Sequence, residues 1–376
     1  MPAETEPEHL LTEFLVGTVA VLAALALFQI FFLRGPDLRR FDRATGERFG
    51  ADRAPSAGHR AVVNSLGGIS SALRQLPRRS HLGWLRRYMD TAFPVADTAC
   101  RIMPVDAGGV KAEWVLAPGA DPRRRMLYIH GGAWIVGSPT SHRRLTAKFS
   151  EVANAAVLAI DYRLMPEHPR QAGIDDCRSA WRWMTEHGPD APAPASALFV
   201  AGDSAGGNLA LSLIAWVRDQ GLRAPDAVVA LSPATDGTLG SPSLKDNIPT
   251  DPMLGPMFRA LARVPRSVLL WAAWARHRIR PCDPVVSPVF GNLAGLPPVL
   301  VQVSEAEMLF DDARRYVNKA AAAGSPVVLQ SWSHMVHVWQ LFHPELPEGQ
   351  EAFEAIRAFL QSRSATGSAV DATTVP

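Results

Sequence analysis

The chain has 376 residues, a formal net charge of +2 and 20% charged residues. This length and an apolar content of 47% allow a sizeable core in one large or two ordinary domains, which excludes a disordered or fibrous protein. The near-neutral charge and scattered arginines give no indication of a nucleic-acid-binding surface, and no nucleic-acid partner is expected. Three distant cysteines without metal-ligand spacing, Cys100, Cys177 and Cys282, indicate free thiols in a reducing compartment.

The N-terminal residues 1–33 carry the pattern of a membrane anchor. Residues 14–33 contain no charged side chain, and at about 1.5 Å per residue they are long enough to cross a hydrocarbon core of about 30 Å. Residues 1–13 are acidic, whereas arginines begin at Arg34. The positive-inside rule therefore places the catalytic part of the chain on the cytoplasmic face.

Two alternatives to a spanning anchor stay open for residues 14–33. One is a hydrophobic cap helix that lies over the active site or on the membrane surface. The other is a cleaved signal peptide, although the basic residues lie on the wrong side and residues 31–34 offer no small-residue cleavage site.

Residues 34–97 are arginine-rich, with glycine and proline breaks, and predict short helices that form part of a cap. Residues 98–363 are expected to form the catalytic domain. Its first element is a predicted hairpin over residues 101–116, in which Pro104 marks an edge strand.

Beyond Arg125, short apolar runs alternate with amphipathic segments. This alternation predicts a mostly parallel sheet with helices on both faces, an α/β fold whose site lies at the carboxyl ends of the strands. The expected strands are 126–129, 157–160, 197–201, 227–231, 299–303 and 327–332, and the expected helices are 142–154, 174–187, 205–218 and 309–323.

Residues 240–285 interrupt this alternation with a proline-rich apolar insert, which we interpret as a lid over the site. Its aromatic residues, such as Trp271 and Trp274, fit an acyl pocket or ordinary core packing equally well. The chain is expected to close with a helix over 348–361 and a disordered tail over 364–376.

Two glycine-rich motifs follow predicted strands. Ser204 lies between Gly202 and Gly206, after an apolar run and before a helical segment, which is the context that a nucleophilic serine in a G-x-S-x-G turn requires. Residues 130–134, His-Gly-Gly-Ala-Trp, follow an earlier strand, and their small side chains leave backbone amides free to face an oxyanion.

Together these motifs resemble the α/β-hydrolase fold, and more narrowly the hormone-sensitive-lipase-type carboxylesterases. The resemblance implies ester hydrolysis without metal or cofactor, and a cap built from the N-terminal helices and the insert. The matching segments are His130–Trp134, Asp161–Pro169, Asp175–Asp176, Gly202–Ala210, Leu296–Pro298, Glu307–Asp312 and His337–Trp339.

The resemblance assigns Ser204 as the nucleophile, His337 as the general base and Glu307 as the acid that orients it. Glu305 and Asp311 compete with Glu307 for the acid position. His334 is a rival base, at a position where the family usually has a small residue.

The same resemblance assigns the oxyanion hole to backbone amides of Gly131, Gly132, Ala133 and Ala205, with Gly132 and Ala133 first. Ala133 stands where the family has a third glycine, and its amide is retained.

The sequence therefore predicts a carboxylic ester hydrolase that acts on short- to medium-chain acyl esters. An amide deacetylase of the same fold and a non-catalytic ligand-binding protein are the alternatives. The expected partners are a small-molecule ester or lipid substrate and, through residues 14–33, the membrane. The oligomeric state stays open, with a homodimer among the alternatives.

Overall fold

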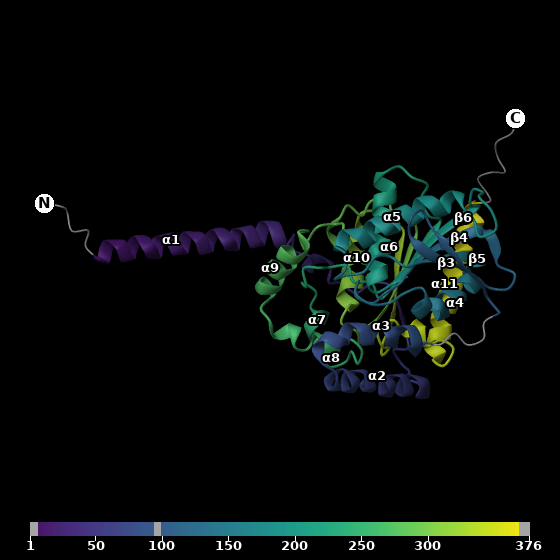
Figure 1. The fold of residues 1–376 in the computed structure, drawn as a ribbon, viewed down its shortest axis with the longest axis horizontal. Coiled ribbons are helices and arrows are strands. Elements are labelled where there is room, and N and C mark those ends of the chain that lie inside the picture. The colour runs from purple at the N-terminus through teal and green to yellow at the C-terminus, as the bar shows by residue number, and fades with distance from the viewer. Residues whose placement is uncertain (1–6, 94–98, 368–376) are drawn as a thin grey trace.

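The computed structural model describes residues 7–93 and 99–367, which are built around one nine-stranded sheet (Figure 1). The strand order is β1-β9-β8-β7-β6-β4-β5-β3-β2. The strands are β1 (Glu47–Phe49), β2 (Arg101–Asp106), β3 (Lys111–Leu116), β4 (Asp121–Ile129), β5 (Ala155–Ile160), β6 (Ala197–Asp203), β7 (Ala227–Leu231), β8 (Val299–Ser304) and β9 (Val327–Trp332).

The sheet is parallel from β1 to β5, and only β3 and β2 run antiparallel to their neighbours. The mostly parallel sheet predicted from the alternation of apolar runs is confirmed. The predicted hairpin over 101–116 is the pair β2–β3, in which Pro104 lies on the edge strand and needs no backbone donor there.

Helices cover both faces of the sheet because the central strands are apolar on both sides. In β4, Leu127 and Ile129 join one buried cluster, whereas Met126 and Tyr128 join the other. The first cluster is covered by α5 (Arg170–Glu186), α6 (Ala205–Asp219) and α10 (Phe310–Ala322), and the second by α4 (Arg143–Ala153) and α11 (Pro347–Gly367).

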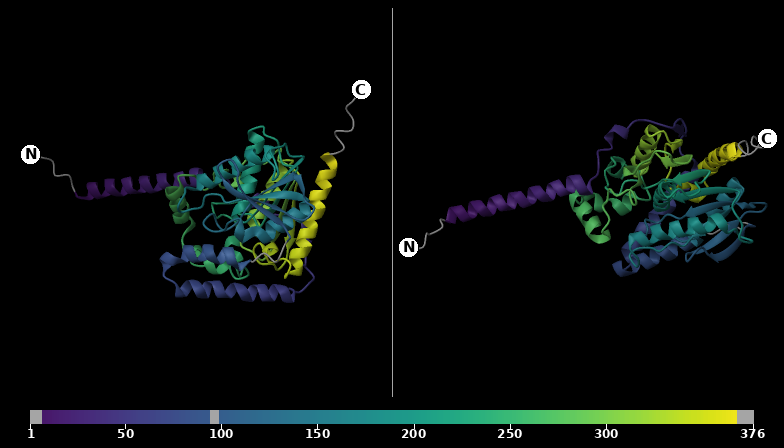
Figure 2. Two further views of the ribbon diagram at one scale, coloured as in Figure 1. Left: turned by 45° about the vertical axis from the view of Figure 1, so that its right-hand side comes forward. Right: turned by 90° about the horizontal axis from the view of Figure 1, so that it is seen from above.

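The remaining helices lie outside these two layers (Figures 1 and 2). Val62 and Leu66 of α2 pack against a cluster that includes Trp332 and Trp339. Arg86 of α3 donates hydrogen bonds to the carbonyl oxygens of Ile135 and Met165. The helices outside the two layers are α2 (Ala57–Gln75), α3 (His81–Ala92), α7 (Ser243–Asp246), α8 (Gly255–Phe258) and α9 (Arg266–His277).

Helix α1 (Pro7–Phe28) continues into the π-helical turn Gln29–Leu33 and projects away from the rest of the molecule (Figures 1 and 2). Within the described residues, Thr12–Leu33 is the helix long and apolar enough to cross a membrane, and its most apolar stretch is 0% buried. Only its C-terminal end packs on the body. There Phe28 contacts Trp271 and Trp274 of α9 and Phe32 contacts Trp274, so both tryptophans pack against the C-terminal end of the apolar helix.

Two parts of the fold differ from the sequence prediction. The region 34–97 contains β1, a three-residue edge strand with no alternating pattern, whose place beside β9 depends on distant residues. Helix α11 extends to Gly367, beyond the end at residue 361 that the sequence predicted. Residues 368–376 lie outside the described residues.

The glycines on either side of β1 allow its contact with β9 to be tested. A Cβ at Gly46 (φ 80°) would overlap the Leu329 carbonyl oxygen, whereas a Cβ at Gly50 (φ 69°) would meet nothing within 4 Å. We expect Gly50→Ala to cost about 1 kcal/mol of unfolding free energy, which is the cost of a left-handed alanine, and Gly46→Ala to cost clearly more. Urea unfolding of the full-length variants measures both, and equal losses would contradict close packing of β1 on β9.

Candidate active site

Ser204 lies on a sharp turn between β6 and α6 with φ 53° and ψ −114°, a backbone conformation that side chains rarely adopt. The turn requires glycine on both sides. A Cβ at Gly202 would lie 2.6 Å from the Gly206 carbonyl oxygen, and one at Gly206 would overlap the Ile129 carbonyl oxygen of β4. The Ser204 amide donates to the Leu231 carbonyl oxygen at 2.7 Å, which ties the strained turn to β7.

Three distant side chains meet above the carboxyl ends of the strands. His337 Nε2 lies 2.9 Å from Ser204 Oγ, and His337 Nδ1 lies 3.2 Å from Glu307 Oε2. Glu307 follows β8, and His337 follows β9. With the proton of neutral His337 on Nδ1, Nε2 can accept the hydrogen bond of the Ser204 hydroxyl.

Burial and neighbouring charges shift the pKa values of Glu307 and His337 in opposite directions. Glu307 is fully buried, and this burial raises the pKa of its carboxyl although His337 partly counters the shift. Burial by itself lowers the pKa of His337, but the charge and hydrogen bond of Glu307, together with the charges of Asp251 and Asp203, outweigh burial and raise the pKa. The imidazole is therefore able to accept a proton near neutral pH and to share the resulting charge with Glu307.

Ser232, which directly follows β7, is a residue at this site that the sequence analysis did not single out. Its hydroxyl donates to Glu307 Oε2 at 2.9 Å and accepts a hydrogen bond from the Val338 amide at 3.3 Å. It thus links the carboxylate to the loop that carries His337. The only signal in the sequence is a polar residue at the carboxyl end of a predicted strand.

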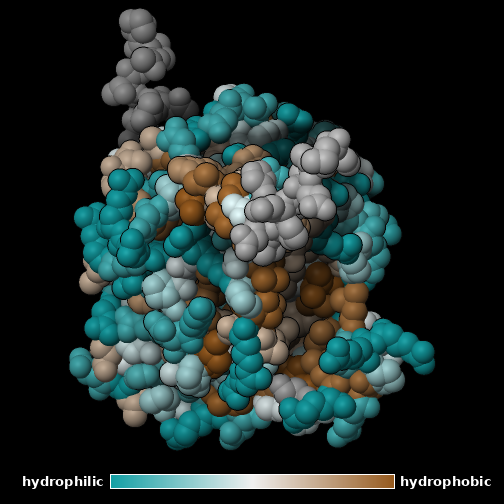
Figure 3. Space-filling view, turned by 90° about the vertical axis from the view of Figure 1, so that its left-hand side faces the viewer, coloured by the Kyte–Doolittle hydropathy of each residue, from teal (hydrophilic) through white to brown (hydrophobic). Residues whose placement is uncertain are grey.

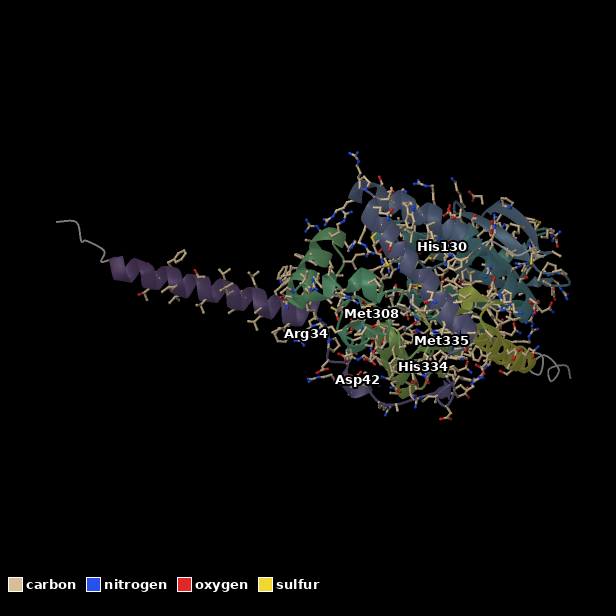
Figure 4. All side chains as sticks on the ribbon, turned by 90° about the horizontal axis from the view of Figure 1, so that it is seen from below. Arg34, Asp42, His130, Met308, His334 and Met335 are labelled. Carbon is tan, nitrogen blue, oxygen red and sulfur yellow. The ribbon has the colours of Figure 1, made fainter. Side chains whose placement is uncertain are left out.

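The rival residues lie elsewhere. Glu305 pairs with Arg48 of β1 at 2.6 Å, and Asp311 pairs with Arg314 at 2.6 Å in the first turn of α10. His334 is exposed beside Met335 (Figure 4). Of the candidate acids, Glu307 is the one that contacts His337.

The loop over residues 130–134 has an unusual backbone, with positive φ at Gly132 (107°), Ala133 (53°) and Trp134 (63°). Within the described residues, the amides of Gly132, Ala133 and Ala205 donate to no protein acceptor. The Gly131 amide instead donates to Asp203 Oδ1 at 3.0 Å, so this bond occupies one of the four amides expected to bind an oxyanion.

Asp203 is a second residue without an assigned role in the sequence analysis. Its buried carboxylate accepts the Tyr128 hydroxyl at 2.6 Å in addition to the Gly131 amide, and it lies 3.4 Å from His142 Nε2. Burial by itself raises the pKa of Asp203, but His142, the Tyr128 hydrogen bond and His130 together outweigh burial and lower the pKa. An ionised Asp203 therefore fixes the loop of residues 130–134 relative to the serine turn.

Trp134 closes the other side of the loop. Its indole Nε1 donates to the Ala205 carbonyl oxygen at 3.2 Å, and the Arg170 guanidinium lies 3.6 Å from the centre of its ring. The loop is thus held on both sides of the serine turn, by Gly131 to Asp203 at the end of β6 and by Trp134 to Ala205 at the start of α6.

Comparison with known proteins bears on the fold and the family. A family model described as the alpha/beta hydrolase fold matches residues 126–341. An acetyl-hydrolase from Streptomyces hygroscopicus is 39% identical over 270 residues, which is 70% of this chain and 83% of that protein. The carboxylesterase/phospholipase LipF from Mycobacterium tuberculosis is 33% identical over 336 residues, which is 85% of this chain and 83% of LipF.

A solved structure gives the same result in three dimensions. The crystal structure of an esterase from the bacterial hormone-sensitive lipase family matches with a TM-score of 0.70 at 34% identity, covering 82% of this chain and 99% of that one. The fold thus defines an α/β hydrolase. Within that class, the chain belongs to the hormone-sensitive-lipase-type carboxylesterases, and it is a carboxylic-ester hydrolase.

Ser232 can be tested separately from the residues that it holds. A hydrogen bond to a charged group is worth about 1.5–3 kcal/mol, so we expect Ser232→Ala to lower kcat/KM for a p-nitrophenyl ester about 10-fold or more, with little change in KM. The control is Ser212→Ala in α6, because the Ser212 hydroxyl is nearly buried and has no partner among the described residues. An unchanged kcat in Ser232→Ala would contradict the link between Glu307 and the His337 loop.

Proposed function

We propose that this chain hydrolyses short- to medium-chain acyl esters through Ser204, His337 and Glu307. The observation that carries the proposal is the hydrogen-bonded series from Ser204 Oγ to His337 at 2.9 Å and on to buried Glu307 at 3.2 Å. A serine, a base and an orienting acid in this order are the parts that acyl transfer requires.

In the first step, His337 Nε2 takes the proton of Ser204 while Oγ bonds to the ester carbonyl carbon. The carbonyl oxygen becomes an oxyanion, which the free amides of Gly132, Ala133 and Ala205 would stabilise. His337 then gives its proton to the departing alcohol oxygen, and an acyl-enzyme remains. Water, deprotonated by His337, attacks this acyl group, and the acid leaves as Ser204 recovers its proton.

The proposed substrate size follows from the family rather than from a measured pocket. One relative is named an acetyl-hydrolase and another a carboxylesterase/phospholipase, so the named activities of the relatives include the removal of a two-carbon acyl group. A short- to medium-chain acyl ester is the range that we propose for this chain.

We also propose that residues 1–33 anchor the protein in a membrane, with residues 98–363 as the catalytic domain on the cytoplasmic side. Residues 34–97 and 240–285 would form the cap. Support for the anchor comes from the exposed apolar helix Thr12–Leu33 and from Arg34 directly after it, where α1 meets the body (Figure 4).

The function is tested by Ser204→Ala, with the Ser212→Ala protein as the control. We expect fluorophosphonate labelling and ester turnover to disappear in Ser204→Ala alone, because the nucleophile is lost. With the unmodified chain, turnover of p-nitrophenyl esters should be highest at short to medium acyl lengths and should exceed that of the matched anilides. Faster anilide cleavage would favour an amide deacetylase, and labelling that survives in Ser204→Ala would overturn the proposal.

The role of Glu307 is tested by the pH dependence of kcat/KM. The unprotonated base is lost as the pH falls through the pKa of His337, which Glu307 raises above 6.5 against the effect of burial. Glu307→Gln removes this charge, so we expect kcat/KM to fall about 10³–10⁴-fold and the acid limb to move to lower pH.

Glu305→Gln is the matched control, because Glu305 lies two residues away and pairs with Arg48 instead of His337. In Glu305→Gln, the acid limb of the pH profile of kcat/KM should stay at the same pH. An unmoved limb in active Glu307→Gln protein would contradict electrostatic coupling between Glu307 and His337.

The anchor is tested by fractionation. We expect the full-length chain to stay with membranes in high salt and in alkaline carbonate, because a spanning helix is held by the hydrophobic effect. Deletion of residues 1–27, which keeps Phe28 and Phe32 on α9, should give active protein that high salt releases. Full-length protein that salt extracts would rule out a spanning helix.

A further inference from the structure

The insert carries a second surface with the chemistry of a membrane contact. Residues 255–280 contain six arginines and no aspartate or glutamate. They also expose Met257 (52%), Leu261 (38%) and Val268 (53%), which are the exposed large hydrophobic side chains of the described residues outside 14–31. Apolar side chains interspersed with arginines are typical of helices that lie in the interface of an anionic bilayer.

This segment is packed directly on the end of α1. The Phe28 ring stacks on Trp271 at 5.2 Å between centroids and meets Trp274 edge-on at 5.6 Å. Trp271 Nε1 also donates to Gln29 Oε1 at 3.2 Å. Tryptophan is favoured at the boundary between lipid tails and headgroups, and here both tryptophans lie where the exposed apolar helix ends.

Arginine side chains also gather next to the end of the apolar helix. A cavity of about 350 Å³ beside Ile30 is lined by four arginines and two acids. The arginines are Arg34, Arg39, Arg266 and Arg315, and the acids are Asp37 and Asp236. The side of the molecule from which α1 leaves also shows apolar surface bordered by hydrophilic side chains (Figure 3).

We propose that residues 255–280 form an interfacial membrane contact, in which Met257, Leu261 and Val268 enter an anionic phospholipid surface while the arginines meet its phosphates. The orientation of this contact rests on the proposed anchor. It gives the insert a role beyond covering the site, because the cap would lie on the bilayer that holds the substrate.

The same insert reaches the catalytic carboxylate. Asn247 donates to the carbonyl oxygens of Glu305 and Glu307, both at 2.8 Å, and Asp251 accepts the Met308 amide at 2.9 Å. The surface over 255–280 therefore follows directly on the segment that holds the Glu307 loop. Contact with lipid would steady the cap next to the acid, and it favours esters that partition into the bilayer.

The test uses the full-length chain in vesicles of phosphatidylcholine and phosphatidylglycerol with brominated acyl chains. An environment-sensitive fluorophore is placed at Val268→Cys, at Val19→Cys in α1, or at Glu354→Cys in α11, in a background with Cys100→Ser and Cys282→Ser. We expect bromolipid to quench the label at 268 several-fold more than the label at 354. Quenching at 19 reports on the anchor by itself.

The outcomes separate the two proposals. If bromolipid quenches the label at 19 but quenches the label at 268 no more than the label at 354, the interfacial contact is overturned and the anchor stands. Quenching at 268 without quenching at 19 supports a surface contact and overturns the span. Quenching at neither position overturns both.

A second measurement uses the variant Met257→Ser/Leu261→Ser/Val268→Ser. We expect its turnover of a lipid ester in anionic vesicles to fall several-fold, while its turnover of soluble p-nitrophenyl acetate stays unchanged, because these residues lie outside the proposed catalytic group. Arg259→Gln with Arg263→Gln should reduce the preference for phosphatidylglycerol over phosphatidylcholine vesicles. Unchanged turnover of the vesicle-borne ester in the triple variant would overturn the interfacial contact.

Discussion

The turn at Ser204 is the constraint on which the site depends. Its left-handed backbone is kept by the surrounding packing, because β4, β7 and the start of α6 all contact it. The absence of a side chain at Gly206 lets α6 approach the Ile129 and His130 carbonyl oxygens. This close approach has a second effect, since the loop over residues 130–134 begins at that same point. One steric requirement therefore positions both the serine and the amides beside it.

Buried charges position the same groups that the packing brings together. Two buried carboxylates flank the serine turn, Asp203 before it in sequence and Glu307 beyond the imidazole. Asp203 accepts two hydrogen bonds and has a lowered pKa, so it acts as a fixed anion under the loop. Glu307 is different, because its Oε1 has no partner among the described residues and its pKa is raised. An anion that is incompletely satisfied gains more from a positive imidazolium, which favours proton transfer to His337.

Much of this architecture could be predicted because its causes are local in sequence. Central strands of a parallel sheet are apolar on both faces. The glycines around Ser204 are required because the turn leaves no room for side chains two positions before and after the serine. The features that were missed have distant causes. Strand β1 forms beside β9 and is held there by the ion pair between Arg48 and Glu305. The contacts of Ser232 are with Glu307 and Val338, which are far from it in the sequence.

The Gly131 amide shows the same limit within a recognised motif. The glycine-rich pattern predicts free amides, but which of them is already bonded depends on Asp203, 72 positions away. The aromatic residues of the insert are a further case. The sequence does not distinguish a substrate pocket from ordinary packing for Trp271 and Trp274, and their contact with Phe28 depends on a segment far away in the sequence.

The junction between α1 and α9 also bears on how the catalytic domain would sit at a membrane. A flexible tether would leave the domain free to rotate, but Phe28 and Phe32 are packed into the tryptophans of the insert before the chain leaves the helix. Leu33 is fully buried, and Cys282 Sγ donates to the Phe32 carbonyl oxygen at 3.3 Å. An apolar helix joined to the body through such a packed end transmits its own orientation to the cap. The direction in which the site faces would then follow from the tilt of one helix, and the cap would meet lipid with the same surface at every encounter.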